Sequence, residues 1–191
     1  MSIHLYQKRA QLEPVLNNVF QDDQGNTVYD VHTPQSLNIG HRTTTVSKYL
    51  RDAEGHDSFE YVAQIEWKVI QSSRIRFANG RLSGQEVKTK DYIRKDAWSF
   101  KRLRDHAFTG EDGKDYVWQY DNYHQKLFPK NDLEHPVAVY TRETLKEGGH
   151  LEVFPPATHL IEEIIVTFIY VENRYVDPTT AAMVAACEPK H

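Results

Sequence analysis

The longest apolar run in the chain stretches from Leu160 to Val171 and contains about 12 residues. It is longer than most β-strands and shorter than the roughly 20 residues that a membrane-spanning helix needs. Wound as a helix, it carries two apolar ridges and leaves only the side of Glu162, Glu163 and Thr167 polar. The ridges are Leu160, Ile164, Phe168 and Val171, and Ile161, Ile165 and Ile169. Such a helix belongs inside a structure, so we expect the rest of the chain to wrap around it.

The residues around this run favour a helix, although its β-branched isoleucines and valines would also suit a strand. Pro155 and Pro156 precede it, and Thr158 offers a hydroxyl that suits an N-cap. Glu162 and Glu163 then fall in the first turns, where acidic side chains suit the helix dipole. Burying large apolar side chains, at roughly 1.5–3 kcal/mol each, outweighs the few tenths that β-branching costs a helix. We therefore predict a buried helix over residues 158–173.

The chain before this helix contains short β-prone segments separated by turn signals. The predicted strands cover residues 3–6, 17–20, 28–31, 41–50, 59–70, 73–77, 107–108, 116–120, 125–128, 137–141 and 151–154. In the longest of them, apolar side chains alternate with polar ones from Phe59 to Val69, which indicates that Phe59 and Tyr61 face the core. A short helix is expected within Val87 to Trp98, with Tyr92 and Ile93 on its inner side.

The spacing of the turns predicts the fold class. Turn signals recur about every 8–14 residues, which favours an all-β barrel or sandwich over βαβ units. We therefore predict a mainly β fold, a closed antiparallel barrel of about ten to twelve strands around the buried C-terminal helix. No linker interrupts residues 1–176, so they are expected to form one domain. Residues 177–191 would follow as a tail or short helix, for which Asp177 and Pro178 resemble an N-cap and first turn.

Composition and motifs exclude several function classes. The single cysteine, Cys187, permits no internal disulfide, and the N-terminus lacks the apolar core of a signal peptide. A cytoplasmic protein, free or peripherally attached to a membrane, is expected. The ten histidines show no His-x-His or His-x₃-His spacing, and no Gly-x-Ser-x-Gly or phosphate-binding glycine loop is present. We assign no catalytic residue, metal ligand or cofactor, and the sequence favours a non-enzymatic protein without deciding the question.

Charge is unevenly distributed along the chain. The net charge is −4, yet the segment from Arg74 to Arg104 holds ten basic residues and three acidic ones. The basic residues are Arg74, Arg76, Arg81, Lys88, Lys90, Arg94, Lys95, Lys101, Arg102 and Arg104. Together with Tyr92, Trp98 and Phe100 they could contact lipid headgroups or another polyanion, or they could form a solvated face. The negative net charge of the chain disfavours nucleic acid as the partner.

The order of several segments resembles a known group of proteins. These segments are NNVFQDDQGNTVYDVHTP, RTTTVSK, IEWKVIQSSRIRF, the strand Tyr116–Trp118 and LEVFPPATHLIEEIIVTFIYVENR. Over residues 15–175 they resemble an uncharacterised fungal domain family of the tubby C-terminal-like barrels, a group with phospholipid scramblases and plant LURP-one-related proteins. The resemblance implies a closed barrel threaded by a hydrophobic helix, and several relatives act at membranes or on phosphoinositides. It implies no catalytic residues, and the acidic loop Arg51–Asp57 and the tail after Asp177 depart from it.

Two functional hypotheses follow from the sequence. The first is a non-enzymatic intracellular binding module for anionic lipid headgroups, such as phosphoinositides, or for a protein partner, with Arg74–Arg104 as the contact region. The second is a small-ligand-binding or catalytic barrel with a site lined by Tyr, Trp and His at one mouth. Basic side chains that converge on one face would favour the first, and a deep polar pocket would favour the second.

Overall fold

The computed structural model describes residues 1–8, 15–34, 41–52, 54–68, 71–95, 105–120, 124–142 and 149–176. Its strands are β1 (Ile3–Gln7), β2 (Asn18–Gln21), β3 (Thr27–His32), β4 (His41–Arg51), β5 (Asp57–Lys68), β6 (Arg74–Phe77), β7 (Glu86–Lys88), β8 (Arg94–Lys95), β9 (His106–Thr109), β10 (Asp115–Tyr120), β11 (His124–Pro129), β12 (Ala138–Thr141) and β13 (His150–Val153). The helices are α1 (Thr89–Tyr92) and α2 (Ile161–Val176), and η1 (Val15–Asn17) and η2 (Pro155–Leu160) are 3-10 turns. The mainly β fold with a C-terminal helix that the sequence predicts is confirmed.

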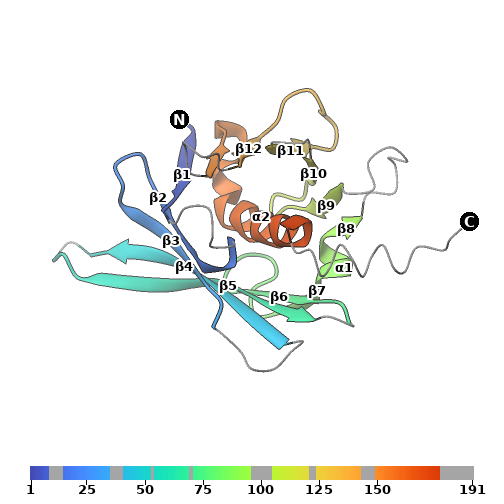
Figure 1. The fold of residues 1–191 in the computed structure, drawn as a ribbon. Coiled ribbons are helices and arrows are strands. Elements are labelled where there is room, and N and C mark those ends of the chain that lie inside the picture. The colour runs from blue at the N-terminus through green and yellow to red at the C-terminus, as the bar shows by residue number, and fades with distance from the viewer. Residues whose placement is uncertain are drawn as a thin grey trace, which may run out of the picture.

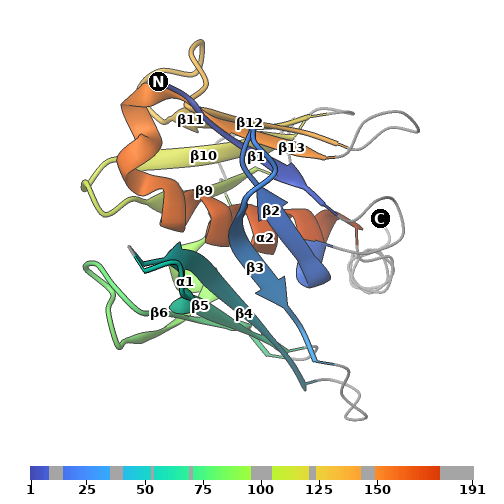
Figure 2. The same cartoon turned by 90° about the vertical axis from the view of Figure 1, so that its left-hand side faces the viewer.

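All these strands join one antiparallel sheet, in the order β7-β6-β5-β4-β3-β2-β1-β13-β12-β11-β10-β9-β8. Two meanders, β1–β7 and β8–β13, meet where β1 pairs with β13, with Ile3 opposite Val153. The sheet curls so that α2 lies between the β3–β7 side and the β9–β13 side (Figures 1 and 2). The core therefore lies along the helix.

The two edges of the sheet, β7 and β8, are neighbours in the chain. Five residues, Thr89 to Ile93, separate them and contain α1. Within the described residues β7 and β8 form no ladder with each other, so the hydrogen-bonded closure expected of a barrel is not seen. The Thr89 N–H still donates to the Ser73 carbonyl at 2.8 Å, in line with the β6–β7 ladder, and the chain then crosses the gap as one helical turn in which the Ile93 N–H donates to the Thr89 carbonyl at 2.6 Å. The prediction of a short helix within Val87–Trp98 is correct only for Thr89–Tyr92.

Helix α2 fills the interior as the sequence predicts. Its residues Ile164, Ile165, Val166, Phe168 and Ile169 are fully buried. The Phe168 ring contacts the rings of Phe20, Trp118 and Tyr140, with centroids 4.4–6.3 Å apart. The prediction of Thr158 as N-cap is wrong, because the Pro155-Pro156 pair starts the 3-10 turn η2 ahead of it. The Thr158 hydroxyl donates instead to the Pro155 carbonyl, at 3.2 Å.

The two described indoles of the core have hydrogen-bond partners inside it. Trp67 Nε1 donates to the Thr44 hydroxyl at 2.7 Å, and Trp118 Nε1 donates to the Thr167 hydroxyl at 3.0 Å. The Thr167 hydroxyl in turn donates to the Glu163 carbonyl one turn earlier in α2. These bonds give the buried indole N–H and hydroxyl groups hydrogen-bond partners, without which their burial would destabilise the fold.

A β-bulge in the β4–β5 ladder changes which side chains face the core. Val46 pairs with Ala63 and Ser47 pairs with Tyr61, so Val62 is the extra residue. The prediction that Phe59 and Tyr61 face the core is wrong, since 60% of Phe59 and 37% of Tyr61 are exposed. The bulge shifts the alternation by one residue, and Val62 is buried in their place.

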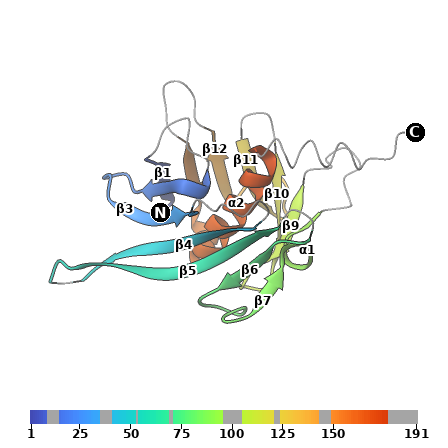
Figure 3. The ribbon, with the colours of Figure 1, turned by 60° about the horizontal axis from the view of Figure 1, so that its bottom comes forward.

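The β4–β5 hairpin extends well beyond the rest of the sheet (Figure 3). Its end is closed by an ion pair between Arg51 Nε and Asp57 Oδ1, at 2.7 Å. No helix in the described part of the chain is long and apolar enough to cross a membrane. The predicted Asp177-Pro178 helix start and Cys187 lie outside the described residues.

Candidate functional site

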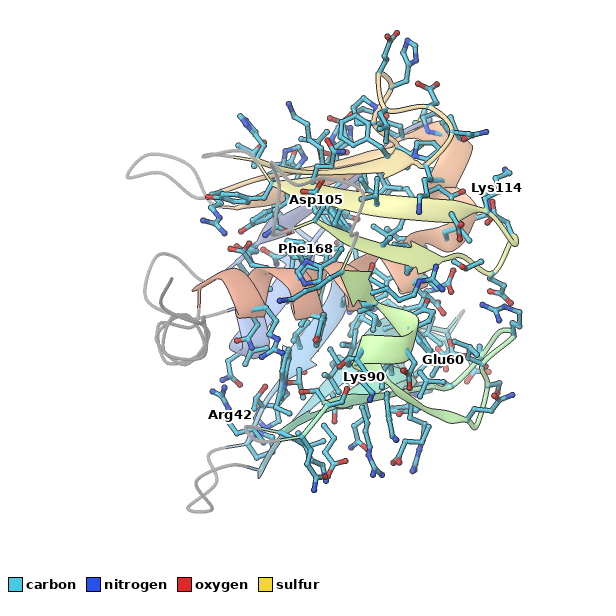
Figure 4. All side chains as sticks on the ribbon, turned by 90° about the vertical axis from the view of Figure 1, so that its right-hand side faces the viewer. Arg42, Glu60, Lys90, Asp105, Lys114 and Phe168 are labelled. Atoms are coloured by element: carbon cyan, nitrogen blue, oxygen red, sulfur yellow. The ribbon has the colours of Figure 1, made fainter. Side chains whose placement is uncertain are left out.

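The outer face of strands β4–β7 carries a polar hollow of about 270 Å³. Alternation along β6 and β7 sends Ile75 and Val87 inward, so Arg74, Arg76 and Glu86 point outward. The residues that line it are Thr43, Gln64, Glu66, Arg74, Ile75, Arg76 and Glu86. We call it the β6 hollow. Figure 4 shows side chains with nitrogen and oxygen tips that project from this sheet face, away from α2.

Two guanidinium groups share one carboxylate in the β6 hollow. Glu86 contacts Arg74 Nη1 through Oε1, and its Oε2 lies 3.3 Å from Nη2 of Arg76. The Arg76 side chain remains 52% exposed. Lys88 lies directly across the ladder from Arg74, is exposed, and has no acidic partner in the part of the chain described. The positive charge of this surface is therefore only partly neutralised.

The second carboxylate of the β6 hollow, Glu66, is paired with Lys68 at 2.9 Å. The carboxylates that line the β6 hollow are thus Glu66 and Glu86, beside the cations of Arg74, Arg76, Lys68 and Lys88. Exposed ion pairs of this kind contribute only about 0–1 kcal/mol each. The arginines can therefore exchange Glu86 for a stronger acceptor, and a guanidinium binds phosphate through two parallel hydrogen bonds.

The predicted basic residues do not form one surface. Arg81 and Arg94 turn towards Thr109 on β9, where Arg81 Nη2 approaches the carbonyl and Arg94 Nη2 the hydroxyl, both at 3.4 Å. Arg94 also lies 3.7 Å from Asp115. Lys90 is on α1 and Lys95 on β8, whereas Lys101, Arg102 and Arg104 lie outside the described residues. Of the ten, Arg74, Arg76 and Lys88 share the outer face of β6 and β7.

The sequence reading missed the residues that β4 and β5 contribute to this face. Gln64 pairs with Arg76, and Glu66 pairs with Arg74, across the β5–β6 ladder. Thr43 lies opposite Glu66 on β4. The alternation of apolar and polar residues along β5 is a local signal. Only the register between strands shows that these side chains meet.

Two exposed rings, Phe59 and Tyr61, and the partly buried ring of Tyr49 continue the outer face beyond the β6 hollow. Tyr49 on β4 lies opposite Phe59 on β5, with ring centroids 5.5 Å apart at an angle of 71°. The Tyr61 hydroxyl donates to the Arg76 carbonyl at 3.2 Å and so connects these rings to the hollow. We call Tyr49, Phe59 and Tyr61 the aromatic strip. The strip and the hollow form one continuous surface.

The hairpin tip holds a group of possible metal ligands. Oxygen or nitrogen atoms of Asp52, Glu54 and His56 lie within 4.8 Å of one another, and all three residues are exposed. The Asp52 carboxylate already accepts the N–H groups of Glu54 and His56, at 2.9 and 2.8 Å. The His56 amide is the main cause of the lowered pKa of Asp52. The Asp52 carboxylate thus has a structural role, because it closes the turn at the hairpin tip.

A buried polar cluster lies near the C-terminal end of α2. Arg142 Nη2 contacts Glu172 at 2.8 Å, Arg142 Nη1 donates to the Tyr120 hydroxyl at 3.1 Å, and Gln125 also donates to Glu172. Burial raises the pKa of Glu172, and the hydrogen bond from Arg142 opposes the shift. The cluster joins β10, β11 and α2. It is the feature closest to the alternative hypothesis of a polar site at one mouth.

Comparison with known proteins gives one match. A family model described as "Family of unknown function (DUF6593)" matches residues 13–175. That span runs from η1 to the last turn of α2 and leaves out β1. No curated protein matches the chain, and no solved structure does.

Proposed function

The chain belongs to the family of unknown function DUF6593, and we propose that it is a binding module whose β6 hollow holds a phosphorylated anion. The observation that carries this proposal is the pair Arg74 and Arg76, which share the single carboxylate of Glu86 on an exposed sheet face. Lys88 adds a third cation beside them. A phosphate group offers more acceptor oxygens and more negative charge than Glu86 alone.

The same phosphate chemistry could come from a lipid headgroup or from a soluble phosphate. The aromatic strip supports a lipid source, because exposed rings beside a basic surface suit the headgroup layer of a membrane. The acidic hairpin tip, with Asp52 and Glu54, supports a soluble ligand instead, since an anionic membrane repels it. The experiment below separates the two sources. A lipid source would make the chain a peripheral membrane protein of the cytoplasm.

We also propose that the curled sheet is a barrel of the tubby C-terminal-like type. The central helix α2, the antiparallel order of the strands and the short α1 link between the two sheet edges support this relationship. An experimental structure would test it through the strand pairing around residues 94–104. A β7–β8 ladder, or one formed through those residues, is expected. If the edge strands β7 and β8 remained unpaired, the sheet would not be a closed barrel.

The test compares vesicles of phosphatidylcholine with and without a phosphoinositide, and soluble inositol phosphate by calorimetry. Arg74→Glu with Arg76→Glu is expected to weaken binding by about tenfold or more, because each charge near a surface contributes about 1 kcal/mol. Raised salt should weaken it too. The matched control is Lys114→Glu on the β9–β10 turn (Figure 4), which should leave binding unchanged. Unchanged binding by the double arginine variant would reject the site.

Glu86→Gln is the sharper test, because it is expected to raise the affinity for phosphate, whereas the arginine substitutions lower it. It removes the carboxylate that competes for both guanidinium groups, so phosphate binding should strengthen. Binding to vesicles alone would identify a lipid, whereas binding to both ligands with equal affinity would identify the phosphate group itself. Weaker binding by Glu86→Gln would mean that Glu86 positions the arginines and does not compete with the ligand.

A further inference from the structure

Two histidines far apart in the sequence meet on the outer face of the ladder between β1 and β13, strands that lie side by side in Figure 2. His4 pairs with Glu152, and Tyr6 pairs with His150. The three rings are stacked, with centroids 4.5 Å apart for Tyr6 and His150 and 5.3 Å apart for His4 and His150. The imidazoles are therefore held side by side where the two meanders of the sheet join.

The distance between the two imidazoles matches that of ligands on one metal ion. His4 Nδ1 lies 3.1 Å from His150 Nε2. Two nitrogens bound to one ion at 2.0–2.1 Å, at ordinary angles, are about 3.0–3.4 Å apart. The His4 side chain is 30% exposed, so its ring can turn and an ion can enter. The two nitrogens share one proton in a hydrogen bond, which a metal ion would replace as the rings turn their lone pairs towards it.

The surroundings of His4 also suit metal binding. Glu152 Oε1 lies 3.8 Å from Nε2 of His4, the ring nitrogen that faces away from His150. A carboxylate on that side favours the tautomer with the proton on Nε2, in which the lone pair of Nδ1 points towards His150, as outer carboxylates do at metal sites. Asp23, on the β2–β3 turn, forms a hydrogen bond with Tyr6 and acts electrostatically on His150. Its negative charge favours a cation beside His150.

We propose that the β1–β13 ladder binds a divalent transition-metal ion through His4 Nδ1 and His150 Nε2. Imidazole nitrogens favour Cu²⁺, Ni²⁺ and Zn²⁺ over Mg²⁺ and Ca²⁺. Water completes the coordination, and the Glu152 carboxylate lies beside the far edge of the His4 ring. His4 lies outside residues 13–175, so membership of the family does not imply this site. A bound ion would clamp β1 to β13 and so stabilise the joint between the two meanders.

The test uses the full chain, stripped of metal with a chelator, and Ni²⁺ or Zn²⁺ added in calorimetry and thermal unfolding. Wild type is expected to bind one ion and to unfold at a higher temperature when it is present. His4→Ala and His150→Ala should each lower the affinity at least about tenfold and abolish the thermal shift. Both rings are partly exposed, so folding of the variants can be confirmed by circular dichroism before metal is added.

Two matched variants keep the result specific. His56→Ala removes the histidine of the hairpin-tip cluster and should leave affinity and thermal shift unchanged. Glu152→Gln should weaken binding less than loss of a ligand does, because it acts through His4. Paramagnetic Ni²⁺ should broaden the ring signals of His4 and His150 in NMR spectra. Absent binding by wild type, or binding that is lost with His56→Ala and kept with His4→Ala, would overturn the proposal.

Discussion

The β4–β5 hairpin has two halves that share strands and composition but differ in their surroundings. In the inner half, Ala63, Ile65 and Trp67 are buried against the core. In the outer half, Phe59 and Tyr61 face solvent. The bulge at Val62 separates the halves. Apolar residues are buried where another layer lies over them, so the pattern of a strand alone does not tell which of its residues are in the core.

The outer half is attached to the core mainly through polar contacts. Lys48 on β4 contacts Glu162 on α2 at 3.1 Å, and Arg51 pairs with Asp57 near the tip. Exposed pairs of this kind contribute little to stability. The inner half and α2 therefore carry the stability of the fold, while the outer half is available for binding. The following predictions test this division, from the largest expected effect to the smallest.

Ile164→Asp in α2 is expected to unfold the protein. Ile164 is fully buried, so the new carboxylate would lose its hydration without gaining a partner. The free energy of unfolding should fall by more than about 4 kcal/mol, which is exceptional for a single substitution. Urea unfolding followed by tryptophan fluorescence measures it. Ile164→Val is the control and should cost about 0.5–1.5 kcal/mol. A folded Ile164→Asp protein would show that α2 is peripheral.

Trp67→Phe in the inner half should destabilise the fold by about 1–3 kcal/mol. It removes the indole N–H bond to Thr44 and part of the stacked contact with Tyr170, whose ring centroid lies 5.7 Å away. The Thr44 hydroxyl keeps its bond to Thr33, which limits the loss. The shift of the urea midpoint at constant m-value measures it. No shift would show that the inner half is not strongly coupled to the core.

The carboxyl groups of the two regions should respond to pH with opposite signs. Burial raises the pKa of Glu163 on α2, so the native state binds more protons there than the unfolded chain does. Its contribution to stability therefore improves as pH falls through that raised pKa and is complete below the ordinary pKa of the unfolded chain. The bond from Arg51 lowers the pKa of Asp57 in the hairpin, and the benefit of that pair is lost only as pH falls through the lowered value.

The comparison of wild type with Glu163→Gln across a pH series tests this. The stability of wild type relative to the variant should rise as pH falls below neutral, because protonated Glu163 resembles glutamine in charge. NMR titration of the hairpin amides near Asp57 should show a transition only at more acidic pH. A stability difference that does not change with pH would contradict the raised pKa of Glu163.

Phe59→Ala in the outer half should have the smallest effect, within about 0.5 kcal/mol, as is usual for surface substitutions. The same truncation at Phe168, which is fully buried, should cost about 3–5 kcal/mol. Urea unfolding of both variants makes the comparison directly. A cost at Phe59 close to that at Phe168 would mean that the aromatic strip is covered by part of the chain.

Local signals in the sequence were sufficient for the helix and for most strands, but not for the short edge strands β7 and β8, which were not predicted. The length and apolar ridges of the stretch after Leu160 defined α2, and period-two alternation defined most of β5. The bulge at Val62 could not be predicted, because it depends on how β5 pairs with β4. The start of the helix was misplaced because Pro155 favours a 3-10 turn ahead of Thr158.

The candidate sites were predictable only in part for the same reason. Arg74 and Arg76 stood out as basic residues in a predicted strand, whereas their shared contact with Glu86 depends on the pairing of β6 with β7. Glu66 and Gln64 join them through strand register, which no local pattern encodes. His4 and His150 lie 146 residues apart, so no spacing rule for metal ligands could have paired them.

The pairing of β1 with β13 also has a consequence for how the chain is made. On a ribosome that adds about 5–20 residues per second, β1 waits on the order of 7–30 seconds before its partner is synthesised. During that interval the first meander exposes both its apolar face and the unpaired edge of β1. Helix α2, which covers the face, emerges later still. Newborn chains of this protein should therefore depend on molecular chaperones until the last turn of α2 has left the exit tunnel.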